Sequence, residues 1–308
     1  MLRGMDTRTL GSLEVSVVGL GCNNFGMRID EARGTEVVRA ALDAGITLFD
    51  TADVYGGTKS EEILGRALGS DRDSVVVATK FGAMDGAHPD TVRSACEASL
   101  TRLGTDRIDL YQVHRPDDEV PIEDTLGALQ ELVAAGKVVE IGCSNFDGPR
   151  VDAAADVSAA KDWPAFVSLQ NQLSLLDRRQ QADTIASCDR HGLGILPYFP
   201  LASGMLTGKF QRGAAPLEGT RLSQLPEDRQ AKVFDDRTFD TVEALTAFAE
   251  ARGHTLLETA MSWLVGLPHM ASVIAGATSP EQVRANAAAS GWALTADEMA
   301  ELDQLTRR

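Results

Sequence analysis

The feature that most constrains this chain is a regular alternation of short apolar, β-branched segments with longer segments of helical periodicity. Seven strand-like segments end at intervals of 26 to 34 residues, and an eighth ends 78 residues later. Each shorter interval has room for one strand and one crossover helix. The segments are VVGLG (17–21), ITLFD (46–50), SVVVATK (74–80), IDLYQVH (108–114), VVEIGCS (138–144), FVSLQ (166–170), GILPY (194–198) and SVIAG (272–276).

The intervening segments show the spacing of amphipathic helices. Val92, Cys96 and Leu100 fall on one helical face, and Gly104 follows as a helix-ending signal. Eight buried strands alternating with helices predict an α/β fold, a parallel (β/α)8 (TIM) barrel rather than an open sheet. No change in composition divides the chain, so residues 1–308 are expected to form a single domain.

Three parts of the chain depart from this alternation. Thr9 to Val15 predicts an N-terminal hairpin that plugs the bottom of the barrel. A long insertion precedes the eighth strand, with an irregular stretch over 199–237 and helical patterns from about Phe239 and Leu256. An extra C-terminal helix is predicted from Thr295.

The net charge of the chain limits the classes of molecule that it is expected to bind. The formal net charge of −16 repels nucleic acid and anionic membranes, so neither is an expected partner. The first residues contain no apolar signal region, and no apolar run approaches the roughly 18 residues of a membrane span. We expect a cytoplasmic protein with four reduced thiols, while its oligomeric state stays open. These thiols are Cys22, Cys96, Cys143 and Cys188.

Reactive side chains gather where the predicted strands end. Asp50, Tyr55, Lys80 and His114 lie at or just after three consecutive strands, and such ends share one face of a barrel. Considered singly, each residue has an interpretation without function: an aspartate after a strand commonly caps a helix, and a lysine at a strand end is commonly a solvated surface charge. Together they form an acid-base cluster, in which a buried Lys–Asp pair is expected to lower the pKa of the tyrosine. No metal is needed.

Longer motifs in these places resemble the aldo-keto reductases over nearly the whole chain, in the branch that holds channel β subunits and bacterial enzymes. The matching motifs are GLGCNNFG (19–26), GITLFDTADVYG (45–56), SEEILGRAL (60–68), KFG (80–82), SLTRLGTDRIDLYQVHRPD (99–117), GKVVEIGCSNF (136–146), GILPYFPLASGMLTGKF (194–210) and VIAGATSPEQVRAN (273–286).

The resemblance implies an NADPH-dependent reduction of an aldehyde or ketone to an alcohol by hydride transfer. Tyr55 would be the general acid, tuned by Lys80 paired with Asp50, and His114 would orient the carbonyl. The hydride would come from the cofactor. A small-molecule carbonyl compound is the implied substrate, and the reverse oxidation of an alcohol stays open.

The resemblance also implies a cofactor that lies extended across the barrel mouth. Its nicotinamide end would meet Gly21, Cys22, Asn23, Asp50, Ser144, Asn145, Gln170 and Tyr198. Its pyrophosphate would be wrapped by Phe199, Pro200, Leu201, Ser203, Gly204, Leu206 and Lys209. Its adenosine end would lie against Arg221, Gly276, Thr278, Ser279, Gln282 and Asn286.

The cations expected around the cofactor favour NADPH over NADH. Lys209, Arg221 and Arg284 would bring positive charge to a 2′-phosphate. The alternative is that Arg221 and Arg284 are surface charges. Two departures from the family pattern bear on this preference, because Ala285 stands where many relatives carry glutamate and Thr278–Ser279 replaces a basic pair.

The sequence does not match the dinucleotide-binding GxGxxG motif of the Rossmann fold. Gly19, Gly21 and Asn24 occupy the three glycine positions of GxGxxG, and the last of them is not glycine. No acidic residue stands at a ribose-binding position, so the Rossmann interpretation is rejected.

Substrate choice depends on the walls of the pocket. The expected walls are Phe25, Val54, Tyr55, Phe81, Met84, His114, Phe146 and the 211–237 segment, although the apolar ones among them could instead be supports beneath the pocket.

Two other functions stay open. In one, the chain binds NADPH as a redox sensor with little turnover. In the other, Lys80 forms a Schiff base in an aldolase-like barrel.

Overall fold

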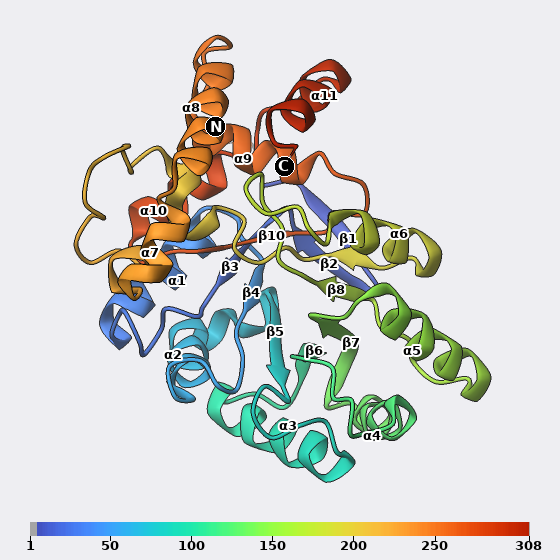
Figure 1. Cartoon of the computed structure of the whole chain (residues 1–308). Coiled ribbons are helices and arrows are strands. Elements are labelled where there is room, and N and C mark those ends of the chain that lie inside the picture. Colours follow the sequence, from blue (N-terminus) through green and yellow to red (C-terminus); the bar gives the residue numbers. More distant parts are fainter. Residues whose placement is uncertain (1–4, 308) are drawn as a thin grey trace.

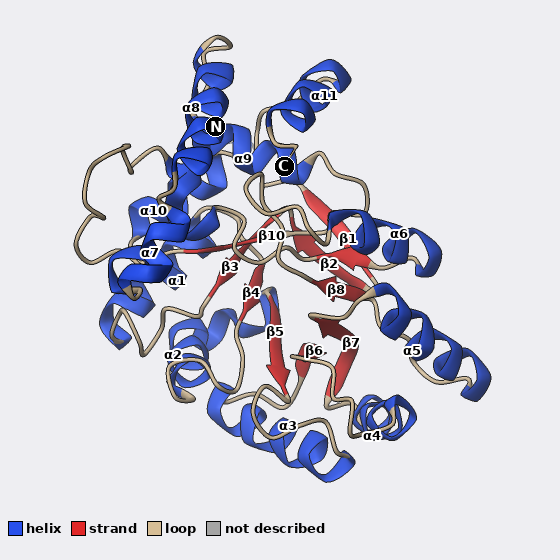
Figure 2. Ribbon diagram, viewed as in Figure 1, coloured by secondary structure: helices blue, strands red, loops and turns tan. Residues whose placement is uncertain are grey.

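A ring of helices surrounds a parallel sheet in the computed structural model of this chain (Figures 1 and 2). The structure describes residues 5–307, so residues 1–4 and 308, at the ends of the predicted domain, lie outside the described part. No helix within the described residues combines the length and apolar character that crossing a bilayer requires.

Eight parallel strands form the sheet, in the order β10-β3-β4-β5-β6-β7-β8-β9. Two hydrogen bonds join the two edges of the sheet. Ile195 N donates to His269 O (2.7 Å), and Ala271 N donates to Ile195 O (3.0 Å). The predicted (β/α)8 barrel is thereby confirmed. Its strands are β3 (Val18–Gly21), β4 (Leu48–Asp50), β5 (Val76–Phe81), β6 (Ile108–Val113), β7 (Val138–Ser144), β8 (Ser168–Gln170), β9 (Gly194–Ile195) and β10 (Val273–Gly276).

The helices pack outside the strands, as the sequence periodicity predicts (Figure 2). In α3 (Pro89–Leu103) the predicted face is buried, and Gly104 ends the helix in the left-handed conformation at φ 64°. The other helices that follow strands are α1 (Glu31–Asp43), α2 (Lys59–Leu68), α4 (Ile122–Ala134), α5 (Gly148–Lys161), α6 (Gln181–His191) and α10 (Pro280–Ala288).

The predicted additions to the barrel are present. The hairpin consists of β1 (Thr7–Leu10) and β2 (Leu13–Ser16). The insertion after β9 carries short 3-10 helices over 202–207 and 222–224, then α7 (Glu227–Val233), α8 (Asp236–Glu250) and α9 (Leu256–Val265). The chain ends with α11 (Ala296–Leu305), which begins at a capping box between Thr295 and Glu298. The two 3-10 helices and α7 were not expected, since they lie within the stretch predicted to be irregular.

Two apolar clusters hold the fold together. The larger one lies between the barrel and its helices. The smaller one joins the hairpin to the inside of the barrel, where Leu10 and Val15 pack with Leu48, Ala78 and Leu110. The hairpin therefore fills the N-terminal end of the barrel and leaves the opposite end, where the strands finish, for the site.

Candidate active site

The inward-facing side chains of the barrel change from apolar to polar along each strand. Alternate residues of a barrel strand point inward, so Leu48 and Asp50 share a row, as do Ala78 and Lys80, and Leu110 and Gln112. The first member of each pair belongs to the apolar cluster inside the barrel. The second lies nearer the carboxyl end of the strand, and all three polar side chains are buried. The top layer of the core is thus a set of polar groups that must satisfy one another.

Lys80 and Asp50 form a buried ion pair in this layer. Lys80 Nζ lies 2.7 Å from Asp50 Oδ2, and the side chains are 0% and 4% exposed. The same ammonium donates a hydrogen bond to the carbonyl oxygen of Thr51 at 2.7 Å. A solvated role for Lys80 is therefore excluded, because isolated charges at this depth are too costly to occur without a partner.

Two glutamine amides complete the surroundings of Asp50. Gln170 Nε2 donates to Asp50 Oδ1 at 2.9 Å, and Gln112 Nε2 donates to the same oxygen at 3.3 Å. Gln170 Nε2 also lies 3.4 Å from Gln112 Oε1. Gln112 was not among the residues singled out in the sequence. Its position two residues beyond the inward-facing Leu110 is the signal that could have identified it.

A tight loop after β4 carries Tyr55 over this layer. Gly56 has φ 60°, and a Cβ atom there would lie 2.3 Å from the carbonyl oxygen of Phe25, so only glycine fits. The far side of the loop is fixed by Ser60, whose buried hydroxyl donates to the carbonyl oxygen of Cys22 at 2.8 Å. The position of Tyr55 is thus determined by its neighbours in the loop.

Tyr55 lies above Lys80 and beside His114. Lys80 Nζ is 5.2 Å from the centre of the Tyr55 ring, and the Tyr55 and His114 rings meet edge to face at 5.7 Å. His114 follows the last residue of β6, and its backbone N–H donates to the carbonyl oxygen of Phe81 at 2.8 Å. The structure therefore brings together the four residues of the predicted acid-base cluster.

The pKa of Tyr55 is raised, whereas the sequence led us to expect that the Lys80–Asp50 pair would lower it. Burial raises this pKa above its ordinary value of 10.0, and the nearby charge of Asp50 also raises it, while the charge of Lys80 opposes both. The expected lowering by Lys80 is present but is outweighed, since loss of water disfavours the phenolate.

His114 is neutral. Burial is the main cause that lowers its pKa from 6.5 to about 3, and the charges of Lys80 and Arg115 lower it further. Its Nδ1 atom is buried without a hydrogen-bond partner in the structure.

A cavity of about 730 Å³ opens above the polar layer, across the carboxyl ends of the strands. Its lining includes most of the residues expected around a dinucleotide or a substrate. These are Gly21, Asn23, Asp50, Val54, Tyr55, His114, Ser144, Asn145, Gln170, Tyr198, Phe199, Pro200, Leu201, Ser203, Gly204, Lys209, Arg221, Gly276, Thr278, Gln282 and Asn286.

Three residues expected to contact the cofactor do not line the cavity. Cys22 and Leu206 are fully buried. The backbone N–H of Cys22 is bonded to Asp50 O at 2.8 Å, and its thiol points toward Leu20 O at 3.7 Å. Ser279 caps α10 by accepting a hydrogen bond from Gln282 N. Cys22 and Leu206 therefore lie behind the cavity walls, and Ser279 serves as the N-cap of α10.

Four of the expected pocket walls are wrong. Phe25, Phe81 and Phe146 are at most 2% exposed and belong to the large apolar cluster, so they support the loops from beneath. Met84 is 82% exposed and lies outside the cavity lining. The alternative role as supports beneath the pocket therefore holds for the three phenylalanines, because their depth depends on packing.

One hydrogen-bond chain connects the ends of β6, β7 and β8. Asn145 Nδ2 donates to the carbonyl oxygen of His114 at 2.9 Å, and Asn145 Oδ1 accepts from the Tyr198 hydroxyl at 2.8 Å. Ser144 Oγ donates to the carbonyl oxygen of Gln170 at 2.8 Å. Asn145 itself adopts φ 62°, a conformation that asparagine tolerates better than most residues. The amides expected to hold a nicotinamide are therefore rigidly placed.

Cations line one side of the cavity. Burial is the main cause that lowers the pKa of Lys209 and of Arg221, and in both cases the charge of Arg28 lowers it further. Arg28 was not foreseen from the sequence; it donates a hydrogen bond to the carbonyl oxygen of Gly219. Arg284 is 60% exposed, lies 3.9 Å from Glu281 and does not line the cavity. Arg284 is therefore a surface charge, whereas Arg221 lines the cavity.

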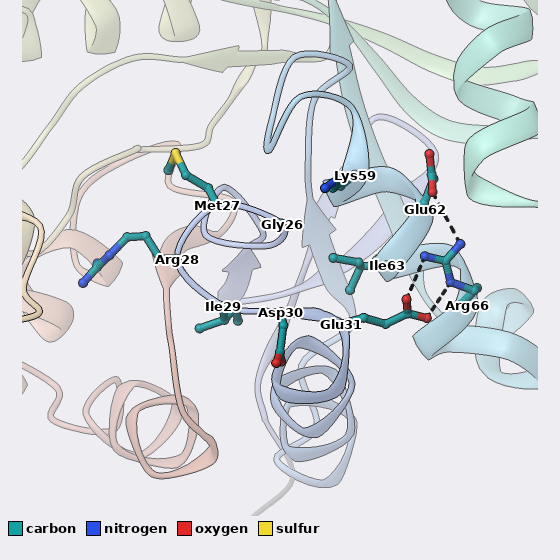
Figure 3. Close-up of a pocket in the computed structure, with 10 residues that line it drawn as sticks. All are labelled: Gly26, Met27, Arg28, Ile29, Asp30, Glu31, Lys59, Glu62, Ile63 and Arg66. Carbon is teal, nitrogen blue, oxygen red and sulfur yellow. Dashed lines mark hydrogen bonds and ion pairs between the residues drawn. The ribbon is translucent and has the colours of Figure 1, made fainter.

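A smaller cavity of about 490 Å³ lies beside the first, between the loop before α1 and the start of α2 (Figure 3). Arg66 is paired with two of its carboxylates, since Arg66 Nε lies 2.6 Å from Glu31 Oε1 and Arg66 Nη1 lies 3.5 Å from Glu62 Oε2. Met27 and Arg28 line both cavities and point away from these ion pairs (Figure 3).

The larger cavity fits a dinucleotide phosphate. Arg28, Lys209 and Arg221 form no ion pair among the described residues. Among the described residues, Asp50 is the only one that brings a carboxylate to the lining, and it is already bonded to Lys80. A wall with unpaired cations and a neutralised carboxylate attracts phosphate even in a chain of net charge −16. Within residues 5–307, no three His, Cys, Asp or Glu side chains are grouped as metal ligands.

Comparison with known proteins places the chain in a family. The model of the Aldo/keto reductase family matches residues 17–307. The aldo-keto reductase YhdN of Bacillus subtilis (strain 168) is 34% identical over 308 residues, covering 95% of this chain and 90% of that protein. The solved structure of the glycerol dehydrogenase AKR11B4 from Gluconobacter oxydans superposes with a TM-score of 0.84 at 30% identity, covering 97% of this chain and 94% of that one. The chain therefore belongs to the aldo/keto reductase family, whose members are oxidoreductases of carbonyl compounds and typically use nicotinamide cofactors.

Proposed function

We propose that this protein reduces an aldehyde or ketone to an alcohol with NADPH, using Tyr55 as the general acid. The observation that carries this proposal is the buried Lys80–Asp50 ion pair at 2.7 Å beneath the Tyr55 ring. Burial keeps the phenol protonated before the reaction, and the charge of Lys80 stabilises the phenolate after the proton has left.

The cofactor would be held by groups already in place. Ser144, Asn145 and Gln170 offer amide and hydroxyl groups to the nicotinamide, and the Tyr198 ring lines the same end. Lys209 and Arg221 offer charge to its phosphates. When bound, the reduced cofactor supplies the hydride.

Tyr55 and His114 act on the carbonyl oxygen of the substrate. The Tyr55 hydroxyl donates its proton to that oxygen as negative charge develops there. Lys80 stabilises the resulting phenolate, and Asp50 keeps the ammonium charged and in position. A neutral His114 orients the oxygen as a hydrogen-bond donor without competing for the proton.

The preference for NADPH rests on the cations of the cavity. Lys209, Arg221 and Arg28 exceed what a pyrophosphate alone requires, so an additional 2′-phosphate is expected to be bound more tightly. Tryptophan-fluorescence titration should give a dissociation constant for NADPH at least about tenfold below that for NADH. Equal constants would contradict the preference.

The decisive experiment is NADPH oxidation with a panel of aldehydes and ketones, using wild type and Tyr55→Phe. Loss of the phenol is expected to lower kcat about 10²- to 10⁴-fold while leaving NADPH affinity unchanged. Tyr111→Phe is the matched control, because Tyr111 is a fully buried tyrosine outside the cavity lining. Full activity of Tyr55→Phe would remove the assignment of the proton donor. Binding of NADPH by wild type without turnover of any carbonyl would favour a redox sensor.

A further inference from the structure

Cations line the larger cavity at several points. The charge of Arg28 acts on Lys209 and on Arg221, and the charge of Arg221 acts on Tyr55. Arg115 also lines the cavity, but its charge acts on His114 and Tyr198, whose pKa values it lowers. Arg115 directly follows His114 in the chain and lines the same cavity, so it lies beside the histidine that would orient the substrate carbonyl in the proposed reaction.

Two of the carboxylates that follow Arg115 in sequence, those of Asp117 and Asp118, are engaged elsewhere. Asp117 accepts hydrogen bonds from Ala87 N at 2.9 Å and Glu119 N at 3.0 Å. Asp118 pairs with Arg150 at 2.8 Å. Across residues 5–307 the Arg115 guanidinium takes part in no ion pair or side-chain hydrogen bond. A chain with 45 acidic and 29 basic residues leaves this cation free at the reacting end of its cavity.

The described lining of the cavity offers no unpaired carboxylate that would repel a bound anion. Asp50 is the single acidic residue of the lining, and both its oxygens are bonded, one to Lys80 and the other to the glutamine amides. Val54, Tyr55, His114 and Tyr198 also belong to the lining and carry no negative charge. An anionic group on the substrate would therefore meet attraction from Arg115 and no opposing charge.

We propose that the substrate is a carbonyl compound that carries a carboxylate, and that Arg115 binds this carboxylate and so determines substrate choice. This inference rests on the proposed reductase function. A guanidinium offers two parallel N–H donors that match the two oxygens of a carboxylate. Arg115 would act on substrate affinity, while Tyr55 and His114 act on the carbonyl at the other end of the same molecule.

Two aldehydes that differ in one charge test the proposal. With saturating NADPH, 4-formylbenzoate and its neutral methyl ester are compared by the ratio of their kcat/KM values. We expect wild type to favour the carboxylate and Arg115→Gln to lower that ratio about tenfold through KM, as loss of one charge-assisted hydrogen bond predicts. Arg115→Lys should keep part of the preference because it keeps the charge.

Arg179→Gln is the matched control. Arg179 is 84% exposed, and its charge also acts on Tyr198, but it pairs with Asp177 at 2.7 Å and does not line the cavity. Its substitution should leave the ratio unchanged. Added salt should lower the ratio of wild type and leave that of Arg115→Gln unaltered, because screening weakens only the charged contact.

The outcomes separate the two proposals. Reduction of both aldehydes with the same ratio in wild type and Arg115→Gln would overturn the carboxylate inference and leave the reductase function standing. Failure of both aldehydes to oxidise NADPH would count against the reductase function. In that case calorimetric titration of the NADPH-loaded protein with 4-(hydroxymethyl)benzoate decides the inference. Weaker binding to Arg115→Gln than to wild type would support it, and equal binding would overturn it.

Discussion

The chemistry of the individual site residues depends on how little water reaches them. Burial raises the pKa of Tyr55 above 10.0 and lowers that of His114 to about 3. Both groups are therefore in their neutral forms across the neutral pH range. A proton donor with a high pKa stays loaded, and a neutral imidazole does not repel Lys80.

The first prediction concerns the pH dependence of the two reaction directions. Reduction should be independent of pH between about 6 and 9, because Tyr55 stays protonated and His114 stays neutral there. Alcohol oxidation needs the phenolate as a base, so its kcat/KM should rise by up to about tenfold per pH unit over the same range. Steady-state rates in both directions check this. A reduction rate that instead changes with pH around a midpoint near 6.5 would show that His114 titrates in this range.

The second prediction concerns Gln112, which is buried against Asp50. Gln112→Glu would place a second carboxylate beside Asp50, with Lys80 as the one cation to share. An uncompensated buried charge costs on the order of 3–5 kcal/mol, so the variant should unfold at a lower temperature. Its kcat should fall as pH rises and the new carboxyl group ionises.

Gln112→Met is the control for this substitution, because it keeps the volume and adds no charge. Thermal unfolding and the pH dependence of kcat distinguish the two variants. Equal pH profiles for both would show that Gln112 does not influence the acid-base cluster.

At the scale of elements, the loop after β9 supplies two cations of the cavity lining, Lys209 and Arg221. Phe199, Ala202 and Ser203 adopt positive φ values of 54°, 45° and 56°, and Gly204 follows at φ 100°. A Cβ atom at position 204 would lie 2.8 Å from Nζ of Lys209. The turn therefore needs glycine both for its backbone and for the approach of the lysine.

The third prediction follows from this close approach. Gly204→Ala should displace Lys209 and weaken NADPH binding about tenfold, the loss expected for one charge-assisted contact. Gly208→Ala is the matched control, since Gly208 has φ 77° but no atoms within 4 Å of its Cβ position. Fluorescence titration with NADPH compares the two. Equal losses in both variants would indicate backbone strain rather than displacement of Lys209.

At the scale of the whole molecule, the barrel distributes its four cysteines around its circumference. Cys22 follows β3, Cys96 lies in α3, Cys143 in β7 and Cys188 in α6, and all four are free and buried. Burial raises the pKa of Cys96 and of Cys188 to about 12, and it raises those of Cys22 and Cys143 well above their ordinary value. None of these thiols is reactive while the fold is closed.

The fourth prediction treats residues 1–308 as one cooperative domain, which we propose from the continuous strand–helix alternation. All four thiols should react with an aromatic disulfide reagent at one common rate set by global unfolding. Labelling in increasing denaturant, followed by mass spectrometry of the modified peptides, measures the four rates. Early labelling of one cysteine would show that its part of the barrel opens independently.

The sequence by itself determined the barrel, its hairpin and the candidate acid-base cluster. Strand and helix periods are local properties, and parallel strands connected by helices bring their carboxyl ends to one face wherever they stand in the chain. Asp50, Tyr55, Lys80 and His114 could therefore be grouped without coordinates. The family motifs added the expected cofactor residues, most of which line the cavity.

Only the tertiary structure decided how deep each side chain lies and which charges find partners. Phe25, Phe81, Phe146 and Met84 could not be assigned to wall or support from sequence, because depth depends on packing between segments distant in the chain. The pKa of Tyr55 is raised rather than lowered for the same reason, since loss of water outweighs the attraction of Lys80. Arg115 is free because distant backbone and side-chain groups engage its acidic neighbours, and such pairing is a property of the folded chain alone.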